Sequence, residues 1–436
     1  MAMAVNYRYN YFTPPPINYQ NVKFYTTISD PVMVAGPGMP ITFVINSDSN
    51  FINFSESYLR FKIKLTLANG DNIPDNNDNH VTFIPNIFHS VWNIVRVRYN
   101  DFLVTPSSDI YGHKAYIETL FTSNADSKNS DFMTDFQPDT GAANAVGANN
   151  PPFQARCLRT NRSRPVELSG QLCVDFLKNS RNILPNSKIE ITLFPKPAPF
   201  IIQRDAHGTV AGVNFNYRIL DPQFFIRREE IIPSTALAIE ARLGRQAATH
   251  YYPLSVIKPY HLAQGIFNYR ADDVFGNQIP LKVIVAFVNS EAYNGSYETT
   301  PFYFNPTANL ENIEFFKSGI RVGLQRVCET NLAEHSTDLH TGYRELQNAV
   351  SGGQPEKGLS FSLSDYRRGY FFYASDLTSD GFDAQPHRYP TETGNLSIHV
   401  KFRAALQDSL QMLIYGVFQE TLSVNKSRGV TTTVNV

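Results

Sequence analysis

The chain has 436 residues, too many for one ordinary hydrophobic core, and because β-sandwiches often reach roughly 200 residues we expect two domains. Aromatic residues make up 13% of the sequence, which favours β-sheets and packed interfaces. Only 18% of the residues are charged and the net charge is −1, so copies of the chain repel one another weakly, as expected of a protein that assembles.

Cysteine usage and the N-terminus argue against secretion and membrane insertion. Cys157, Cys173 and Cys328 form no CxxC pair and cannot all pair within the chain, so a disulfide framework is not expected and a reducing compartment fits best. The first residues, MAMAVNYRYN, lack the apolar segment of a signal peptide. No stretch reaches the roughly 18 apolar residues that would cross a bilayer.

Residues 1–29 are interpreted as an N-terminal arm. They contain no acidic residue, they alternate Tyr7, Tyr9 and Tyr11, and the three prolines at 14–16 impose a stiff, extended segment. Two interpretations remain open at this stage. The tyrosines favour an arm that contacts a neighbouring subunit, whereas a loose terminus is the commoner fate of chain ends.

The first domain is predicted over residues 30–230. Residues 58–67 alternate apolar side chains with Arg60, Lys62, Lys64 and Thr66, the pattern of an antiparallel strand with one solvated face. The loop that follows, residues 68–79, consists of turn-forming residues and is predicted to be exposed. Further strands are predicted at residues 41–45, 95–99, 172–177, 189–194 and 215–226, the last interrupted at Asp221-Pro222. A helix capped by Ser108-Asp109 is predicted over residues 110–121.

Residues 124–164 are predicted to form a long surface loop, because most of the segment is poor in apolar residues and rich in Asn, Ala, Gly and Pro. It ends in a basic cluster of Arg156, Arg159, Arg162 and Arg164. Such a cluster can contact phosphate or nucleic acid, so weak contact with a genome is one interpretation. A solvated edge or a salt-linked subunit contact is the other, and the neutrality of the whole chain favours it.

A short helix is predicted to join the two domains. Residues 234–243, STALAIEARL, are rich in alanine, with Ser234 as the expected cap and Gly244 as the stop. Because this helix separates two strand-rich blocks of similar length, residues 231–245 are assigned to a linker and residues 246–436 to the second domain.

In the second domain, residues 281–288 contain one polar side chain in eight, Lys282, and are predicted to form a central strand covered on both faces. Other strands are predicted around Val256 and Ile257 and at residues 302–304, 313–322, 370–374, 396–402, 412–418 and 421–424. Turns are predicted at 272–273, 276–277 and 294–295, and a helix at 338–349.

No catalytic, cofactor-binding or metal-binding residue is predicted. The sequence lacks GxxxxGK[ST], HExxH, GxSxG and GxGxxG motifs. His335 and His340, with Glu334 and Asp338, have a spacing that a metal could use, but five residues do not bring two side chains to one helical face. The pairs Asp272-Asp273 and Asp376/Asp380 could supply glycosidase carboxylates, yet they stand in turn contexts where Asp caps its own backbone. Arg367-Arg368 is interpreted as a strand-edge charge.

Short motifs follow one another in a characteristic order along nearly the whole chain. In the first half they are residues 59–65, Phe88-His89-Ser90-Val91 and residues 111–120. In the second half they are Tyr252-Pro253-Leu254, Gly265, Asp273-Val274-Phe275, Gln278-Ile279-Pro280, residues 283–288, Ala292-Tyr293-Asn294-Gly295, Pro301-Phe302-Tyr303-Phe304-Asn305, Gly369-Tyr370 and Asp376-Leu377-Thr378-Ser379-Asp380. Together they resemble the major capsid proteins of Polinton/Maverick elements and of the related adintoviruses, with Ser379 where proline is usual.

The resemblance implies an all-β double jelly roll: two consecutive eight-stranded jelly-roll β-sandwiches, with short helices in loops and between the domains, which the strand count also fits. Such hexon-type proteins form homotrimers that tile an icosahedral shell, so the expected partners are other copies, penton proteins and minor capsid proteins. We expect no enzymatic activity and no cofactor, and a location in a virion assembled inside the host cell. A single jelly-roll penton protein is one alternative, although it needs only one sandwich. A two-domain glycan-binding or glycan-cleaving β-sandwich protein is the other.

Overall fold

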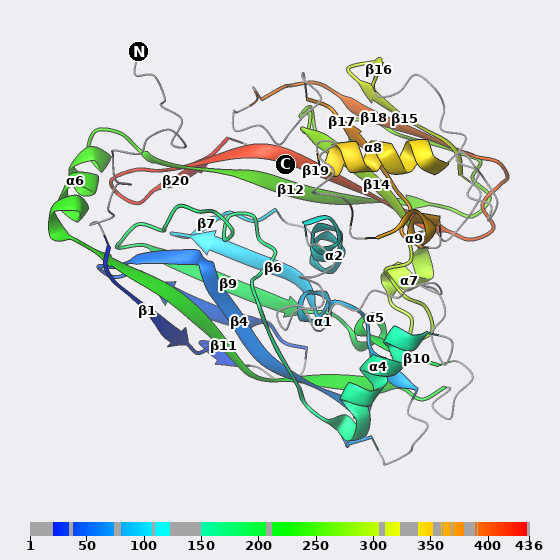
Figure 1. The fold of residues 1–436 in the computed structure, drawn as a ribbon, viewed down its shortest axis with the longest axis horizontal. Coiled ribbons are helices and arrows are strands. Elements are labelled where there is room, and N and C mark those ends of the chain that lie inside the picture. Colours follow the sequence, from blue (N-terminus) through cyan, green and yellow to red (C-terminus); the bar gives the residue numbers. More distant parts are fainter. Residues whose placement is uncertain are drawn as a thin grey trace, which may run out of the picture.

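The computed structural model consists mainly of antiparallel sheets with a few short helices, which confirms the all-β fold class. It describes residues 21–34, 38–73, 80–106, 110–122, 150–205, 212–304, 310–322, 339–351, 359, 361–367, 369–378, 389 and 391–433. Figure 1 shows two stacks of strands, one from each half of the chain, with helix α6 (Pro233–Leu243) at the end where the chain passes from one stack to the other.

Two sheets face each other in the first half. Their strands alternate buried and solvated side chains, so each sheet has one apolar face, and these two faces pack together. The first sheet contains, in order, β1 (Asn21–Ser29), β11 (Phe215–Ile231), β4 (Phe51–Leu67) and β8 (Val166–Gly170). The second contains β2 (Met33–Val34), β3 (Ile41–Asn46), β9 (Lys188–Pro195), β6 (Trp92–Tyr99) and β7 (Phe102–Leu103). Phe43, Phe61, Trp92 and Phe224 fill the space between them and are fully or almost fully buried. A short ribbon pairs β5 (Val81–Phe83) with β10 (Ile202–Arg204).

The second half repeats this plan. One sheet contains β12 (Ala248–Leu262), β19 (Leu410–Val424), β14 (Lys282–Asn289) and β17 (Phe372–Asp376), with β20 (Val430–Thr432) beside β19. The other contains β13 (Asn268–Ala271), β18 (Leu396–Phe402), β15 (Leu310–Lys317) and β16 (Ile320–Val322). Residues 283–288 of β14 are all buried and β14 lies between two strands, so the predicted central strand is confirmed. Strands up to β11 pair among themselves, and so do strands from β12 onward.

Helices occupy loops and the passage between the halves. They are α1 (Ile87–Ser90), α2 (Tyr111–Thr122), α4 (Pro151–Thr160), the 3₁₀ turn η3 (Asn161–Ser163), α5 (Ala198–Ile201), α6, α7 (Ser290–Asn294), α8 (Leu339–Ser351) and α9 (Leu363–Arg367). The helices predicted at 110–121, 234–243 and 338–349 are confirmed as α2, α6 and α8. The cap of the first of them, residues 108–109, lies outside the described residues. None of the helices in the described ranges is long and apolar enough to cross a bilayer.

The predicted cap of α6 at Ser234 is wrong. The helix begins at Pro233, and Ile232 takes the cap position without a side-chain hydrogen bond. Proline lacks an N–H and its φ is already helical, so it starts a helix at the first position without a capping side chain.

The predicted loop at 124–164 contains a helix that composition did not reveal. Asn150 caps α4 by accepting a hydrogen bond from the backbone N–H of Phe153 (3.4 Å), and two prolines occupy the first turn. Phe153, Arg156 and Thr160 are buried, which is the spacing of one helical face. Residues 123–149 lie outside the described residues.

Two predicted strands are turns. Residues 172–177 are buried but form a turn in which the Val174 carbonyl accepts from the N–H of Leu177 (3.0 Å). Residues 302–304 are also irregular, although Phe302 and Phe304 are buried. Both runs have the apolar composition of a strand without its alternation, and each is held by packing between the halves rather than by a sheet.

Four further details differ from the prediction. The strand predicted at 313–322 is two antiparallel strands, β15 and β16, joined by a turn at Ser318-Gly319. Residues 21–29, assigned to the arm, form β1 in the chain's own sheet, whereas residues 1–20 lie outside the described part. The interruption at Asp221-Pro222 is a register shift within one continuous strand, β11, where Asp221 has φ +48°. The predicted exposed loop at 68–79 includes Ile73, which is buried.

Candidate functional site: the buried junction between the two halves

The structure gives the predicted carboxylate pairs roles in their own turns. Asp272 pairs with Arg270 (2.7 Å), and this hydrogen bond lowers the pKa of the exposed carboxyl. The Asp273 carboxylate accepts from the N–H of Asn277 (2.7 Å), where Asp273 has φ +47°. Asp376 accepts from the N–H (2.9 Å) and hydroxyl (2.7 Å) of Thr378. Asp380 and Arg368 lie outside the described residues, as does the side chain of Arg367.

No metal-binding group is present in the described ranges: no cluster of three or more His, Cys, Asp or Glu side chains there could hold an ion. His340 belongs to α8, but its side chain is not among those described, and Glu334, His335 and Asp338 lie outside the described ranges. Cys157 and Cys173 are free thiols. Cys328 lies outside the described residues.

The arginine cluster divides into a buried member and three exposed members. The Nε of buried Arg156 donates to the carbonyl of Phe83 (3.0 Å), and a terminal guanidinium nitrogen donates to the Gln203 side chain (3.4 Å). Arg156 therefore fastens α4 to the β5–β10 ribbon. Arg159, Arg162 and Arg164 are exposed.

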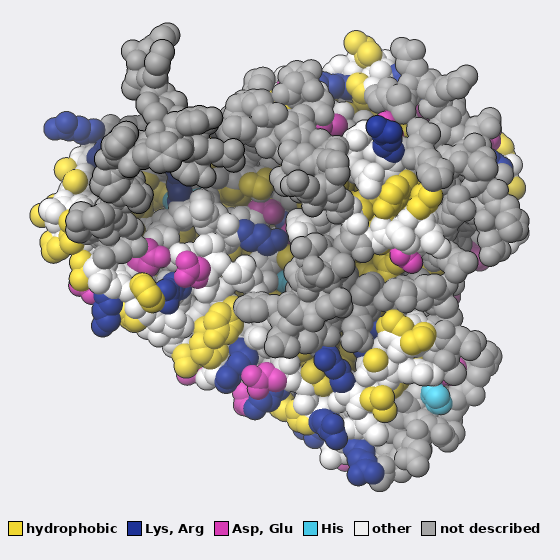
Figure 2. Space-filling model, viewed as in Figure 1, with side chains coloured by type: hydrophobic (Ala, Val, Ile, Leu, Met, Phe, Trp, Pro, Cys, Tyr) yellow, Lys and Arg dark blue, Asp and Glu magenta, His cyan; other side chains and the backbone are white. Residues whose placement is uncertain are grey.

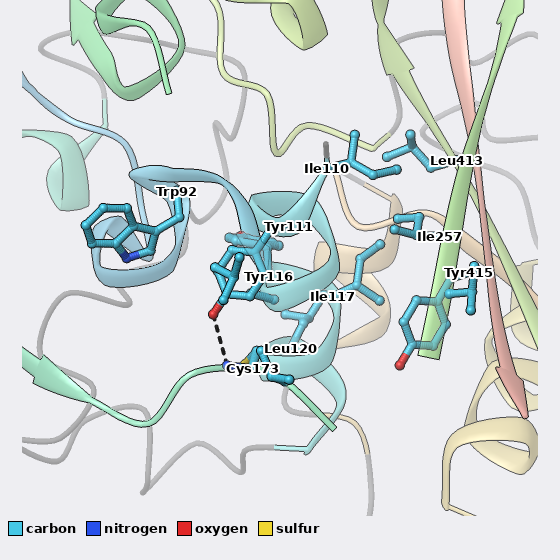
Figure 3. Close-up of a cluster of buried hydrophobic side chains, with 14 of the residues drawn as sticks. Trp92, Ile110, Tyr111, Tyr116, Ile117, Leu120, Cys173, Ile257, Leu413 and Tyr415 are labelled. Carbon is cyan, nitrogen blue, oxygen red and sulfur yellow. Dashed lines mark hydrogen bonds between the residues drawn. The ribbon is translucent and has the colours of Figure 1, made fainter. Parts of the chain in front are cut away.

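Helix α2 is the element around which the two halves meet. All residues from Tyr111 to Leu120 are buried, so the helix is covered on every side. Figure 3 shows Ile110 and Ile117 directed toward Ile257 on β12 and toward Leu413 and Tyr415 on β19. A first-half helix thus packs directly on a second-half sheet.

A charged network of two lysines and two carboxylates lies at this junction, in which Lys114, Glu118 and Asp175 are buried and Lys178 is exposed. Lys114 of α2 contacts Asp175 (2.7 Å) and Glu118 (3.5 Å), and Lys178 contacts the other oxygen of Glu118 (2.8 Å). Asp175 also accepts from the N–H of Ser255 on β12 (2.9 Å). This carboxylate therefore connects a helix of the first half to a strand of the second.

The pKa shifts follow from burial and pairing. Burial would lower the pKa of Lys114, but the charges of Asp175 and Glu118 outweigh it and raise that pKa. Burial would raise the pKa of Glu118, but Lys114 and Lys178 outweigh it and lower that pKa. For Asp175, burial prevails over the attraction of Lys114 and raises the pKa. Three of the four charges, Lys114, Glu118 and Asp175, are buried, whereas Lys178 is exposed, so removal of one buried charge leaves its buried partner without compensation.

Aromatic rings continue the junction beyond the charged groups. Tyr116 of α2 stacks on Phe302 of the second half, with centroids 4.0 Å apart and planes at 6°. His113 stacks on Tyr293 of α7 (5.3 Å). At Gly295, which has φ +109°, an added Cβ would lie 3.0 Å from the backbone N of Phe200, so only glycine lets these two backbones approach so closely.

A hydrogen-bonded trio lies on the first-half side of α2. The Tyr111 hydroxyl accepts from the N–H of Cys173 (2.9 Å), the bond drawn in Figure 3, and lies 3.0 Å from Nδ1 of His89. Burial lowers the pKa of His89 to about 3, with the charge of Lys178 adding to the effect. Burial raises the pKa of the Cys173 thiol to about 11. A neutral imidazole and a protonated thiol make this a structural trio rather than a nucleophile with its base.

Two hollows among the described residues lack the parts of a glycosidase. A cavity of about 40 Å³ lies between α2, residues 173–176 and β12; it could hold a water molecule but no sugar ring, and its Asp175 is paired with Lys114. A groove of about 540 Å³ lies beside α6 and includes Arg181, Arg242 and His250. Its described lining contains no carboxylate, so it cannot provide a catalytic acid and base.

The sequence analysis did not find the charged junction. A signal was present, because Lys114 and Glu118 are spaced four residues apart in an otherwise apolar helix, and Asp175 interrupts an apolar run. Their pairing joins positions 61 residues apart, which no local pattern indicates.

Comparisons with known proteins place the fold. No protein-family model matches the chain. An uncharacterized protein of Caenorhabditis elegans, F54H12.2, is 22% identical over 404 residues, which cover 89% of this chain and 92% of that protein. The structure of the Sputnik virophage contains a similar chain, with a TM-score of 0.61 and 13% identity over 98% of this chain and 92% of that one. The mavirus major capsid protein matches with a TM-score of 0.56 and 10% identity over 100% of this chain and 95% of that one. The fold is therefore that of the double jelly-roll capsid proteins.

Replacing Lys114 with Met is expected to reduce the free energy of unfolding by about 3–5 kcal/mol, because Asp175 loses its nearest cation while it stays buried. Chemical unfolding at pH 7 measures the loss. Adding Asp175→Asn to Lys114→Met removes the stranded charge and should recover part of it. A loss below about 1 kcal/mol for Lys114→Met would contradict the role given to this pair.

Acid should destabilise the protein through its buried histidines. Burial lowers the pKa of His113 to about 3, with the Lys196 charge acting in the same direction. Between pH 6.5 and about 3 the unfolded chain binds a proton at this residue that the folded chain does not, so stability falls as the pH falls. By pH 5 this amounts to about 2 kcal/mol.

Calorimetry of His113→Phe tests this contribution. The melting temperature of the variant minus that of the wild type should be larger at pH 5 than at pH 8. The same change at His261, whose ring is exposed, controls for the loss of one histidine. Parallel pH curves for the wild type and His113→Phe would show that His113 does not contribute.

Proposed function

We propose that this chain is a major capsid protein of the Polinton/Maverick and adintovirus type, which forms homotrimers that tile an icosahedral shell as pseudo-hexagonal capsomers. The observation that carries the proposal is a fold likeness along the whole chain to capsid proteins, together with the sequence motifs in the same order. In the described residues, the sites with catalytic potential are occupied by turn or junction contacts. Function is therefore assigned to surfaces.

The domain assignment supports this role. Residues 30–230 and 246–436 would be the two jelly rolls and residues 231–245 the linker, so a trimer presents six similar sandwiches around its axis. The buried junction at α2 suits such a unit, because a shell tile must keep its two sandwiches in one fixed arrangement. The resulting partners are other copies first, then neighbouring trimers, penton proteins and minor capsid proteins, in a virion assembled inside the host cell.

Light scattering on the purified chain tests the proposal. A stable particle of three times the 49.2 kDa chain mass, with a hexagonal outline in negative stain, is the expected result. A chain that stays monomeric at high concentration would contradict it, and binding on a glycan array would then favour the sugar-binding alternative.

Deletion of residues 1–20 should leave a folded trimer that assembles poorly into larger shells. The segment carries Tyr7, Tyr9 and Tyr11 with a stiff proline run, which provide contact area at low entropic cost. Circular dichroism measures folding, light scattering measures trimer formation, and particle pelleting measures assembly into shells. An unfolded or monomeric product would refute the arm hypothesis, as would unchanged assembly.

A further inference from the structure

Strand β1 exposes a row of large apolar side chains. Val22, Phe24 and Ile28 alternate along one face of the strand and are 59%, 62% and 55% exposed. Figure 2 shows hydrophobic side chains interleaved with charged ones on the flank that β1 and β11 form in Figure 1. Thr26 lies between Phe24 and Ile28 on this face. Burial of large apolar residues is favourable, so a group of them exposed together on a folded surface marks an interaction site.

The apolar row continues across the sheet onto β11 and β4. The pairing register places Ile28 opposite Phe225 and Phe225 opposite Tyr58. The Tyr58 and Phe225 rings stack with centroids 4.8 Å apart. Arg227 lies over the Phe24 ring, 3.7 Å from its centroid. We name the set Val22, Phe24, Ile28, Tyr58 and Phe225 the β1 patch. The residues that contribute most of the binding energy at protein interfaces are often aromatic and arginine side chains, and here such side chains are already held in place.

β1 also has an unprotected edge. It is the end strand of its sheet among the strands that the structure describes, so one side of its backbone faces outward. It is nine residues long, contains no proline, and carries Lys23 as its one charge. A register shift between Asn21 and Lys23 is the single irregularity in its pairing with β11. Proteins usually block such edges with charges, prolines or short length, so this edge favours contact with another chain.

We propose that the β1 patch is the contact through which a second copy of this chain binds in the trimer. The inference rests on the proposed capsid function. Three of the cations around the patch are already paired: Arg227 with Glu56 (3.3 Å), Lys62 with Asp221 (3.5 Å) and Arg60 with Glu167 (4.0 Å). Lys23, the one cation of β1, lies 5.2 Å from the centroid of the Tyr25 ring, so the patch offers a polyanion little unpaired positive charge.

A polyanion or an anionic membrane surface would need unpaired cations here, whereas a neutral protein surface does not. The chain itself has 38 basic and 39 acidic residues, so a second copy is such a surface.

The apolar character of the patch places the contact within the trimer. Interfaces that persist after assembly are more apolar than those that form and break. Contacts between trimers must form reversibly while a shell grows, so a row of three apolar side chains more than half exposed suits the permanent contact.

The test is the variant Phe24→Glu/Ile28→Glu in the full-length chain, measured by light scattering across a concentration series. We expect the wild type to be a trimer and the variant to be a monomer of 49.2 kDa at concentrations at least tenfold above those at which the wild type is trimeric. Circular dichroism should show an unchanged fold, because both side chains are exposed. The control is Leu237→Glu/Ile320→Glu, which charges two equally exposed apolar residues on α6 and β16, outside the patch, and should remain a trimer.

A wild-type trimer together with a variant trimer would overturn the β1 patch and leave the capsid proposal intact. A variant trimer that no longer forms larger shells would also overturn it, because the β1 patch would then mediate contact between trimers and not contact within one trimer. A monomeric wild type would overturn both. Hydrogen exchange on the unaltered chain gives an independent result: amides at 22–28 should exchange more slowly in the trimer than at dilutions that yield monomer, and equal rates would contradict the contact.

Discussion

The salt-bridged contact of Lys114 with Asp175 is the interaction on which the arrangement of the two halves depends. Asp175 accepts from Lys114 on one side and from the backbone of Ser255 on the other, so it connects α2, its own buried segment and β12. The buried charges Lys114, Glu118 and Asp175 add little net stability compared with an apolar core, because each has lost its hydration. Their contribution is orientation: a charged hydrogen bond is satisfied in one geometry, whereas apolar contacts tolerate sliding.

The aromatic rings of the junction contribute the buried apolar surface that the charged groups do not. Tyr116 stacked on Phe302 and His113 stacked on Tyr293 bury large rings from both halves. Close approach at Gly295 brings the two backbones together at the same end of α2. The charges favour one orientation of the two halves and the rings supply the buried area of their contact, which is what the proposed capsid role would require of the two sandwiches.

Sequence analysis succeeded wherever burial imposes a period on the chain. Residues 58–67 alternate, and residues 283–288 are continuously apolar, and both lie in the strands that those patterns predict. Sequence analysis failed where an apolar segment is not a strand and where a polar segment is not a loop. Residues 172–177 are apolar because they fill the junction, and residues 151–160 are polar because α4 buries only one narrow face. The charged junction itself could not be predicted, because Lys114 and Asp175 meet only after the fold has formed.

The junction and the β1 patch place aromatic residues in opposite environments, one buried and one exposed. At the junction, Tyr116 and Phe302 are fully enclosed by the chain's own elements. On β1, Phe24 packs under the guanidinium of Arg227 and stays exposed, on a strand that is at the edge of its sheet among the described strands. A monomer gains nothing from such a surface and risks aggregation through it. If the chain assembles as proposed, a second copy that covers this surface would recover the free energy of its exposure, and the net charge of −1 would oppose that contact little.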